Sequence, residues 1–304
     1  MNLPTVKQLR YFVALETHGH FGRAAQACFV SQSAFSVAIR DFERLLGAQL
    51  VDRSGKQVTI TASGREVAAR ARDCLREMEE LVRLAGSGRD PLAGKLRLGV
   101  IPTIAPFLLP KVLPALREVY PRLRLYLHED LTRRIYEKLM AGELDLILIA
   151  LPYALRNVEL MGLFDDPFRL AAHEHSRLVD PRHYSVADLP PESVLLLEDG
   201  HCLRDHALSA CEIRKPEQVS GFAASSLLTL VEMVDADLGI TYLPQMAVAS
   251  PLLKSTRIRT WPLAENSVRE IGLAWRRGSA FGEAFRELGE FIRAHRAQIE
   301  GEAD

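Results

Sequence analysis

The sequence predicts an α/β protein that begins with a winged helix-turn-helix, continues through a linker helix and ends in a larger α/β domain. Three observations predict this fold class. The chain has 304 residues, which is too long for one average domain. Residues 1–60 carry three short apolar patterns of helical spacing and then a hairpin pattern. Beyond residue 92, strand-like and helix-like segments alternate.

Three helices and a hairpin are expected at the N-terminus. The breaker pair Gly19-His20 separates the first two helices, and Ser31 suits the N-cap of the third. Residues 49–53 and 58–61 flank a turn-rich tip at 54–56, which predicts a wing. The apolar positions of the helices are Leu9, Phe12, Val13 and Leu15, then Phe21, Ala24, Ala25 and Cys28, then Ala34, Phe35, Ala38, Ile39 and Phe42.

A long charged helix is expected over residues 63–84, followed by a turn-rich hinge at 86–91. One side of this helix carries a continuous apolar stripe with no obvious local partner, which predicts pairing with a second copy of the chain. The stripe consists of Val67, Ala71, Cys74, Leu75, Met78, Leu81 and Val82.

The remaining residues alternate between strand and helix patterns, which indicates a parallel sheet covered by helices. The expected strands are 95–100, 123–127, 144–150, 194–197 and 271–275, and the expected helices are 107–120, 133–141, 227–234 and 281–295.

Composition restricts the class of protein. The residues are 48% hydrophobic and 25% charged, which suffices for extensive cores. The net charge is -1, so a surface for nucleic acid must be local, and residues 1–60 hold seven Lys and Arg against four Asp and Glu. No segment is long and apolar enough to cross a bilayer, and residues 1–12 do not resemble a signal peptide. We therefore expect a cytoplasmic protein with no membrane partner, whose thiols are kept reduced.

A helix-turn-helix places its second helix in the major groove of double-stranded DNA. Here that helix would start at Ser31, with Gln32, Ser33 and Ser36 facing base edges, because Gln pairs with adenine and hydroxyls serve bases or phosphates. The expected phosphate contacts, which position the protein without specifying sequence, are Arg23, Arg40, Arg53 and Lys56. On spacing alone, a three-helix packing unit with solvated charges remains an alternative.

A longer pattern resembles the start of a LysR-type transcription regulator. It consists of residues 8–12, 22–25, 30–36 and 39–43, continued by Leu46, Gly47, Leu50, Arg53, Thr61 and Gly64. The resemblance implies promoter DNA and RNA polymerase as partners, and a homodimer or homotetramer. Phe35 and Phe42 stand where this family usually has leucine, and Ser33 where proline or serine is common, which leaves the operator sequence unpredictable.

The resemblance also implies a domain organisation. Residues 1–62 would form the DNA-binding domain, 63–91 the dimerising linker helix and hinge, and 92–304 a regulatory domain resembling type 2 periplasmic binding proteins. Its first lobe would comprise about 92–164 and 268–304, and its second lobe about 165–267.

Residues 198–211, EDGHCLRDHALSAC, have three interpretations. The first is core packing, which also suits Cys28 and Cys74. The second is a metal site formed by His201, Cys202, His206 and Cys211, although the spacing is unlike paired ligand knuckles and we expect no metal.

The third interpretation is a redox switch. Cys202 would be a reactive thiolate, its pKa lowered by His201 and Arg204, and Cys211 would resolve the oxidised sulfur as a disulfide. If residues 203–210 are helical in the reduced chain, nine residues span about 13 Å, whereas a disulfide requires Cα atoms within about 7 Å. The segment must therefore unwind or relocate when the bond forms.

The regulatory half resembles the OxyR branch of the LysR family, whose members sense hydrogen peroxide. The matching residues are 99–103, 106, 108–110, 127–129, 132, 226–227, 229–230, 233–234, 239–241, 243–244, 269 and 271–273, besides the cysteine segment. The resemblance implies that Cys202 is peroxidatic and Cys211 resolving, with no cofactor. It places Thr103, Thr132, His201, Arg204, Asp205 and Arg269 around the peroxide. Threonine and histidine would hold peroxide, and a cation would stabilise the thiolate.

Departures and alternatives remain. His206 stands where the branch more often has glutamine or another polar residue, and Asp237 stands where glycine is usual. Residues 211–221 differ from its best-known members. Thr103 and Thr132 can instead cap helices, and Arg204 can pair with Asp205. A LysR-type regulator that binds a small metabolite between its lobes is the main alternative. A thiol peroxidase is a third, against which the DNA module argues, so we expect no enzyme.

Overall fold

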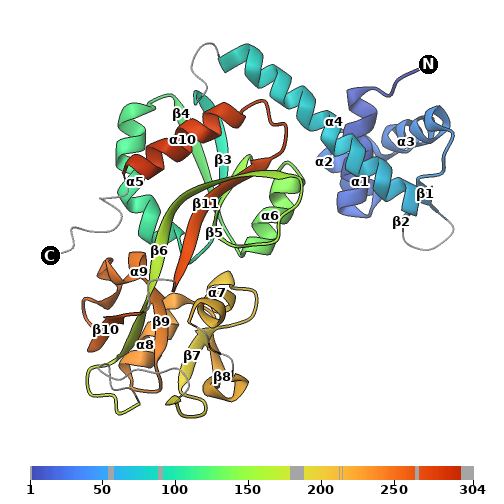
Figure 1. Cartoon of the computed structure of the whole chain (residues 1–304). Helices are drawn as coiled ribbons and strands as arrows, with labels where there is room; N and C mark the ends of the chain where they lie inside the picture. The colour runs from blue at the N-terminus through green and yellow to red at the C-terminus, as the bar shows by residue number, and fades with distance from the viewer. Residues whose placement is uncertain are drawn as a thin grey trace. The chain divides into compact units, whose positions relative to one another are not determined.

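The computed structural model describes residues 2–53, 58–87, 92–178, 188–211, 213, 215–263 and 267–295, with the backbone alone for 83–87. Two compact units, Met1–Gly88 and Arg89–Asp304, make up the chain. The first unit contains α1 (Val6–His18), α2 (Phe21–Ala27), α3 (Gln32–Leu46), β1 (Val51–Asp52), β2 (Thr59–Ile60) and α4 (Ala62–Ser87) (Figure 1).

The second unit contains the remaining elements (Figure 1). In chain order they are β3 (Gly94–Val100), α5 (Ala105–Val119), β4 (Leu123–Glu129), α6 (Thr132–Met140), β5 (Leu146–Leu151), β6 (Val158–His173), β7 (Val194–Leu197), α7 (Cys202–Ala210), β8 (Val219–Ala224), α8 (Leu227–Asp235), β9 (Thr241–Pro244), α9 (Gln245–Val248), β10 (Ile258–Pro262), β11 (Val268–Arg276) and α10 (Gly282–Ala294), with short 3-10 helices at Pro216–Gln218 and Pro251–Leu253.

Local capping explains where the first three helices begin and end. Thr5 and Gln8 form a capping box at the start of α1, and Ser31 Oγ accepts the Ala34 N–H at the start of α3. The prediction of Ser31 as an N-cap is therefore confirmed. Helices α1 and α3 end at Gly19 and Gly47, whose left-handed backbone (φ +59° and +64°) favours glycine.

An aromatic core holds the first unit together. Phe12, Phe35 and Phe42 are fully buried, Tyr11 stacks on Phe35 at 5.0 Å between ring centroids, and Phe12 meets Phe42 at 5.4 Å. The two phenylalanines that stand where leucine is usual thus pack against other rings.

Helix α4 has a local partner along its first half, contrary to the expectation from its stripe. Ala68 and Ala71 are buried in the core of the first unit, and Arg72 pairs with Glu16 of α1. The expectation that Cys74 is a core residue is wrong, because its side chain is exposed in the single chain. The later stripe residues Met78, Leu81 and Val82 are also exposed.

The sheet of the second unit is mixed rather than parallel. Among the described residues, its strands lie in the order β10-β6-β11-β5-β3-β4, and β9 also pairs with β6. Strand β3 is parallel to β4 and β5, as predicted, but β11 is antiparallel to both β5 and β6. The early part of β6 pairs with β11, and its later part pairs with β9 and β10.

The fully buried strand β5 lies at the centre of this packing. Helices α5 and α10 lie on one side of β3, β5 and β11, and α6 lies on the other (Figure 1). A separate parallel pair, β7 and β8, packs with α7 and α8. No helix of the described residues is long and apolar enough to cross a membrane.

Gly64 permits the close approach of α4 to the hairpin, and we predict that Gly64→Ala destabilises the first unit. A Cβ at this position would lie 2.3 Å from the Leu50 carbonyl oxygen, a backbone atom that cannot swing away. The overpacking should cost about 1–3 kcal/mol. Native-state hydrogen exchange of α1 and α4 amides measures it, and Ser63→Ala, at an exposed neighbouring position, is the control. Equal protection in both variants would contradict this account.

Candidate functional site

The start of α3 presents the polar residues expected to face DNA bases. Gln32 and Ser33 are exposed, and Ser36 is half-buried one turn further on. Ser31 Oγ lies 3.1 Å from Ser33 Oγ and also caps the helix, so Ser31 has a structural role besides any contact with DNA. The first turn of α3 thus places an amide and two hydroxyls on the surface.

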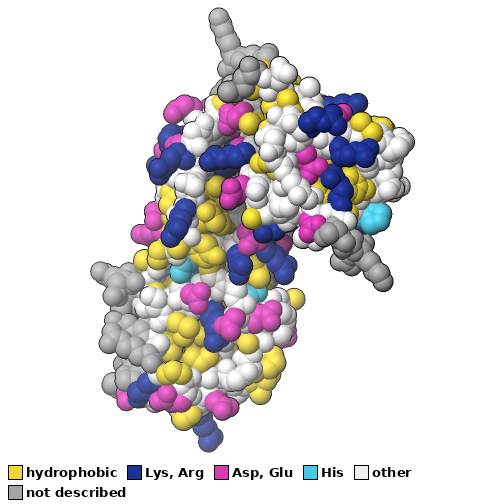
Figure 2. Space-filling view, turned by 90° about the vertical axis from the view of Figure 1, so that its right-hand side faces the viewer, with side chains coloured by type: hydrophobic (Ala, Val, Ile, Leu, Met, Phe, Trp, Pro, Cys, Tyr) yellow, Lys and Arg dark blue, Asp and Glu magenta, His cyan; other side chains and the backbone are white. Residues whose placement is uncertain are grey.

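The four expected phosphate contacts differ in their surroundings. Arg40 is exposed on α3. Arg23 donates to the His18 carbonyl oxygen at 2.8 Å, and Arg53 pairs with Glu43 at 2.7 Å. Lys56 lies outside the described residues. On the face shown in Figure 2, Lys and Arg side chains are interspersed with Asp and Glu.

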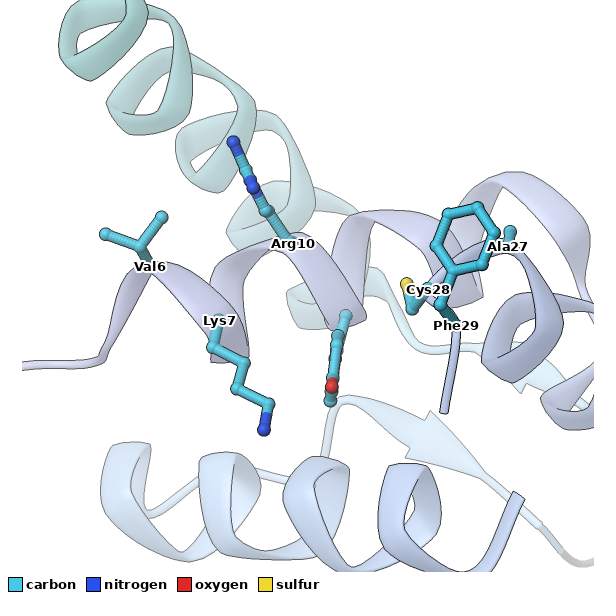
Figure 3. A pocket seen from close by; sticks show the side chains of 7 residues that line it. Val6, Lys7, Arg10, Ala27, Cys28 and Phe29 are labelled. Atoms are coloured by element: carbon cyan, nitrogen blue, oxygen red, sulfur yellow. The ribbon is translucent and has the colours of Figure 1, made fainter. Parts of the chain in front are cut away.

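Cys28 lies beside a hollow of about 510 Å³ in the first unit (Figure 3). Its lining comes from α1 and from the end of α2, and comprises Val6, Lys7, Arg10, Tyr11, Ala27, Cys28 and Phe29. Burial raises the pKa of the Cys28 thiol, and the charge of Arg10 only partly offsets this. Cys28 is half-buried, and its thiol is protonated at neutral pH.

Cys202 and Cys211 lie at opposite ends of one intact helix in the second unit. Cys202 is the first residue of α7, Cys211 is its C-cap, and both are free thiols with about 5% of their surface exposed. Nine residues of helix separate them by about 13 Å along the axis, beyond disulfide reach. The helical segment on which the switch interpretation depends is therefore present.

Burial dominates the ionisation of Cys202. It raises the pKa of the thiol, while the Thr132 hydroxyl and the Arg269 charge lower it and Asp205 raises it. The expectation that His201 and Arg204 lower this pKa is wrong for the reduced state. Burial lowers the pKa of His201 itself, so this imidazole is neutral at pH 7, and Arg204 pairs with exposed Asp199 at 3.0 Å.

Arg269 is the centre of a buried hydrogen-bond network. Its guanidinium donates to Asp166 Oδ2 at 2.9 and 3.0 Å, to Thr103 Oγ1 at 3.1 Å and to the Thr103 carbonyl oxygen at 3.0 Å. All three residues are almost completely buried. Thr103 therefore orients Arg269 and does not cap α5, whose N-cap is Ile104 and has no side-chain bond.

Thr132 brings a second hydroxyl to Cys202. It is the first residue of α6 and does not cap that helix. Thr132 Oγ1 is buried and has no hydrogen bond of regular geometry within the described structure, although the hydroxyl lies near enough to Cys202 to lower its pKa. A buried hydroxyl with free bonding capacity beside a thiol suits a small polar ligand.

The six residues expected around the peroxide thus separate into two groups. Thr132 and Arg269 act on the Cys202 thiol, and Thr103 is bonded to Arg269. The other three have different surroundings. His201 interacts with Glu198 and with the Ser225 backbone. Arg204 donates to the Leu197 carbonyl oxygen, and Asp205 is exposed. The alternative pairing of Arg204 with Asp205 is replaced by the pair with Asp199.

Sequence reasoning missed Asp166 and the surroundings of His206. Asp166 lies in β6, which was not expected as a strand, and its partner Arg269 is 103 residues away. His206 Nε2 lies 2.9 Å from the Pro152 carbonyl oxygen, which ties α7 to the end of β5. At the other end, Ser267 Oγ donates to the Ala210 carbonyl oxygen at 3.0 Å, and burial raises the pKa of Cys211 to about 12.

The metal interpretation gains no support. Within the described part of the chain, no three His, Cys, Asp or Glu side chains gather into a group that could hold a metal ion.

Two family patterns together match almost the whole chain. Residues 6–65 match "Bacterial regulatory helix-turn-helix protein, lysR family", and residues 89–297 match "LysR substrate binding domain".

Individual proteins are similar over most of their length. The transcriptional regulator EstR of Acinetobacter baylyi is 42% identical over 83% of both chains. The transcriptional dual regulator OxyR of Escherichia coli K12 is 38% identical over 95% of both chains, and counterparts in other strains are named hydrogen peroxide-inducible genes activators. The structure of full-length OxyR C199D from Pseudomonas aeruginosa is similar with a TM-score of 0.75, 35% identity and 96% of both chains covered.

Asp166 neutralises a buried cation, so we predict that Asp166→Asn lowers both the stability of the protein and the pKa of Cys202. Stability should fall by about 3–5 kcal/mol, because the Arg269 guanidinium is left without a counter-charge. The pKa of Cys202 should fall, because the cation then acts on the thiol unopposed. Urea unfolding and the pH dependence of Cys202 alkylation measure the two effects. Asp165→Asn, at the exposed neighbouring position, is the control and should change neither.

Arg40 is predicted to contact a phosphate. Arg40→Ala should weaken binding to specific and unrelated DNA by a similar factor and reduce the salt dependence, as the slope of log K against log salt, by about 1. Fluorescence anisotropy over a salt series measures this slope. Arg70→Ala removes the same charge from an exposed position on α4 and should leave the slope unchanged. An equal change of the slope in both variants would mean that only the net charge matters and that Arg40 does not contact a phosphate.

Proposed function

The chain belongs to the LysR family of bacterial transcription regulators, and we propose that it senses hydrogen peroxide by oxidation of Cys202 and disulfide formation with Cys211. One observation carries the proposal: two buried thiols stand at opposite ends of one helix, and the Cys202 thiol interacts with Thr132 and with Arg269, which in turn is held by Thr103. The similarity to regulators named for hydrogen peroxide supports it.

Peroxide would react first at Cys202. The thiolate sulfur attacks one peroxide oxygen, the O–O bond breaks, and the leaving hydroxide takes up a proton to become water. Cys202 becomes a sulfenic acid while peroxide is reduced. Thr103 Oγ1 already accepts a bond from Arg269, so its own proton is available for a peroxide oxygen, and Thr132 offers a second hydroxyl. Arg269 would stabilise the thiolate and the departing hydroxide.

Disulfide formation would follow a rearrangement of α7. Cys211, deprotonated as it leaves its buried position, attacks the sulfenic sulfur, and the hydroxyl group departs as water. The helix cannot remain intact, because its length exceeds disulfide reach. Unwinding breaks the contacts of His206 with Pro152 and of Ala210 with Ser267. The covalent bond would thus hold the chain in a second conformation, which would bind DNA differently.

The DNA-binding unit and the exposed end of α4 suit a regulator that acts as an oligomer. Members of the LysR family bind DNA and form oligomers, and the exposed residues Met78, Leu81 and Val82 of α4 would be covered by a second copy. The proposed domains are 1–62, 63–91 and 92–304, with the lobe boundary in β6, where pairing passes from β11 to β9 and β10. We further propose a homotetramer in the cytoplasm that activates transcription through RNA polymerase.

We predict that stoichiometric hydrogen peroxide joins Cys202 to Cys211 and changes the footprint on promoter DNA. Peptide mapping detects the disulfide, and footprinting with in vitro transcription reports the response. Cys202→Ser should abolish both. Cys211→Ser should stop at the sulfenic acid, which dimedone traps.

The other cysteines provide matched controls. Cys28→Ser and Cys74→Ser should retain the full response, because both thiols belong to the first unit, whereas the network around Arg269 belongs to the second. A regulator with no Cys202–Cys211 bond after peroxide, or with an unchanged footprint despite the bond, would not be a peroxide sensor of this kind. Stabilisation of Cys202→Ser by a small metabolite would then favour a metabolite-responsive regulator.

A further inference from the structure

We propose that His206 is the base that takes the thiol proton of Cys202 when peroxide reacts, an inference that rests on the proposed peroxide-sensing function. The thiol needs such a base because its burial disfavours the thiolate. Arg269 supplies positive charge, but it has no free site to accept a proton, and Asp166 already neutralises much of its charge.

Helix geometry places His206 beside Cys202. The two residues are four apart in α7, so they lie on one face of the helix, with Cβ atoms about 5–6 Å apart. Side chains of a helix lean toward its N-terminus, which directs the His206 ring over the turn that contains Cys202. Both side chains are buried, with 7% and 5% of their surfaces exposed.

The hydrogen bond of His206 determines which ring nitrogen is free. Nε2 lies 2.9 Å from the carbonyl oxygen of Pro152, and a carbonyl oxygen can only accept, so Nε2 carries the proton. In the neutral ring, Nδ1 therefore holds a lone pair. Nδ1 is also buried with no hydrogen-bond partner in the described structure, the Cys202 thiol included, so its accepting capacity is unused until peroxide reacts and the proton moves. The resting protein thus keeps an unused proton acceptor in α7, one helical turn from Cys202.

The surrounding charges keep this ring neutral before the reaction. Burial lowers the pKa of His206 below 6.5, Arg269 on β11 lowers it further, and exposed Asp205 and the bond to Pro152 raise it. Tyr153, beside Pro152, is uncharged at neutral pH, since burial raises its pKa. At pH 7 the imidazole is therefore a base ready to accept a proton.

The step balances in atoms and charge. The Cys202 proton moves to His206 Nδ1, and the thiolate attacks a peroxide oxygen. The O–O bond breaks, the sulfur gains oxygen as a sulfenic acid, and the leaving hydroxide recovers the proton from the imidazolium as water. The ring returns to its neutral form, so His206 is unchanged at the end.

The test compares peroxide reaction rates of Cys202 with and without this base. In the Cys211→Ser background, stopped-flow kinetics from about pH 5 to about pH 9 give the rate constant for sulfenic acid formation. With His206, the rate should fall as the pH drops through the imidazole pKa, below 6.5. His206→Gln keeps an N–H donor for Pro152 but lacks the base, so the rate at neutral pH should fall about 10- to 100-fold and that inflection should vanish.

The outcomes separate this inference from the function on which it rests. If the parent Cys211→Ser chain does not react with peroxide, the sensing function fails and this inference with it. If the parent reacts and His206→Gln has the same rate and the same acidic inflection, only the role of His206 is overturned. His206→Ala, which also loses the Pro152 bond, distinguishes the two contributions: a loss in the alanine variant alone would mean that His206 positions α7 without accepting a proton. Should His206→Gln not fold, absence of the acidic inflection in the parent overturns the inference.

Discussion

The length of helix α7 is the constraint on which the rest of the regulatory unit depends. It keeps the backbones of Cys202 and Cys211 apart by about 13 Å of axial rise, so the reduced chain cannot form their bond by side-chain motion. The middle and the C-terminal end of the helix are tied to other elements, through Pro152 and through Ser267. Oxidation must therefore break tertiary contacts, which turns a local chemical event into a change of conformation.

Burial sets the balance between stability and reactivity at Cys202. The effect of burial on its thiol exceeds the opposing effects of Thr132 and Arg269, because Asp166 offsets much of the arginine charge. This pair is costly to desolvate and holds β6 against β11, next to Thr103. Arg269 thus belongs to the buried network that stabilises the reduced state and also acts on the thiol at which oxidation would begin. A neutral histidine in α7 offers a route for the proton that burial retains on sulfur.

Local patterns predicted what depends on local physics. The Ser31 cap and helices α1 to α6 follow from capping and apolar spacing. Strand β6 was missed, because Asp165, Asp166 and Pro167 interrupt its apolar pattern and its pairing partners come much later in the chain. The partner of Arg204 and the direction of the Cys202 pKa shift were also wrong, since both depend on burial and on long-range contacts that neighbouring residues do not reveal.

Hydrogen exchange across α7 tests the central claim most directly. In the reduced chain the amides of residues 203–210 should be protected, since the helix is intact and anchored at its middle and at its C-terminal end. After stoichiometric oxidation, with the Cys202–Cys211 bond verified by mass, the same amides should exchange at rates close to those of an open segment, while strand β5 stays protected. Unchanged protection of α7 in the disulfide-bonded chain would contradict the account.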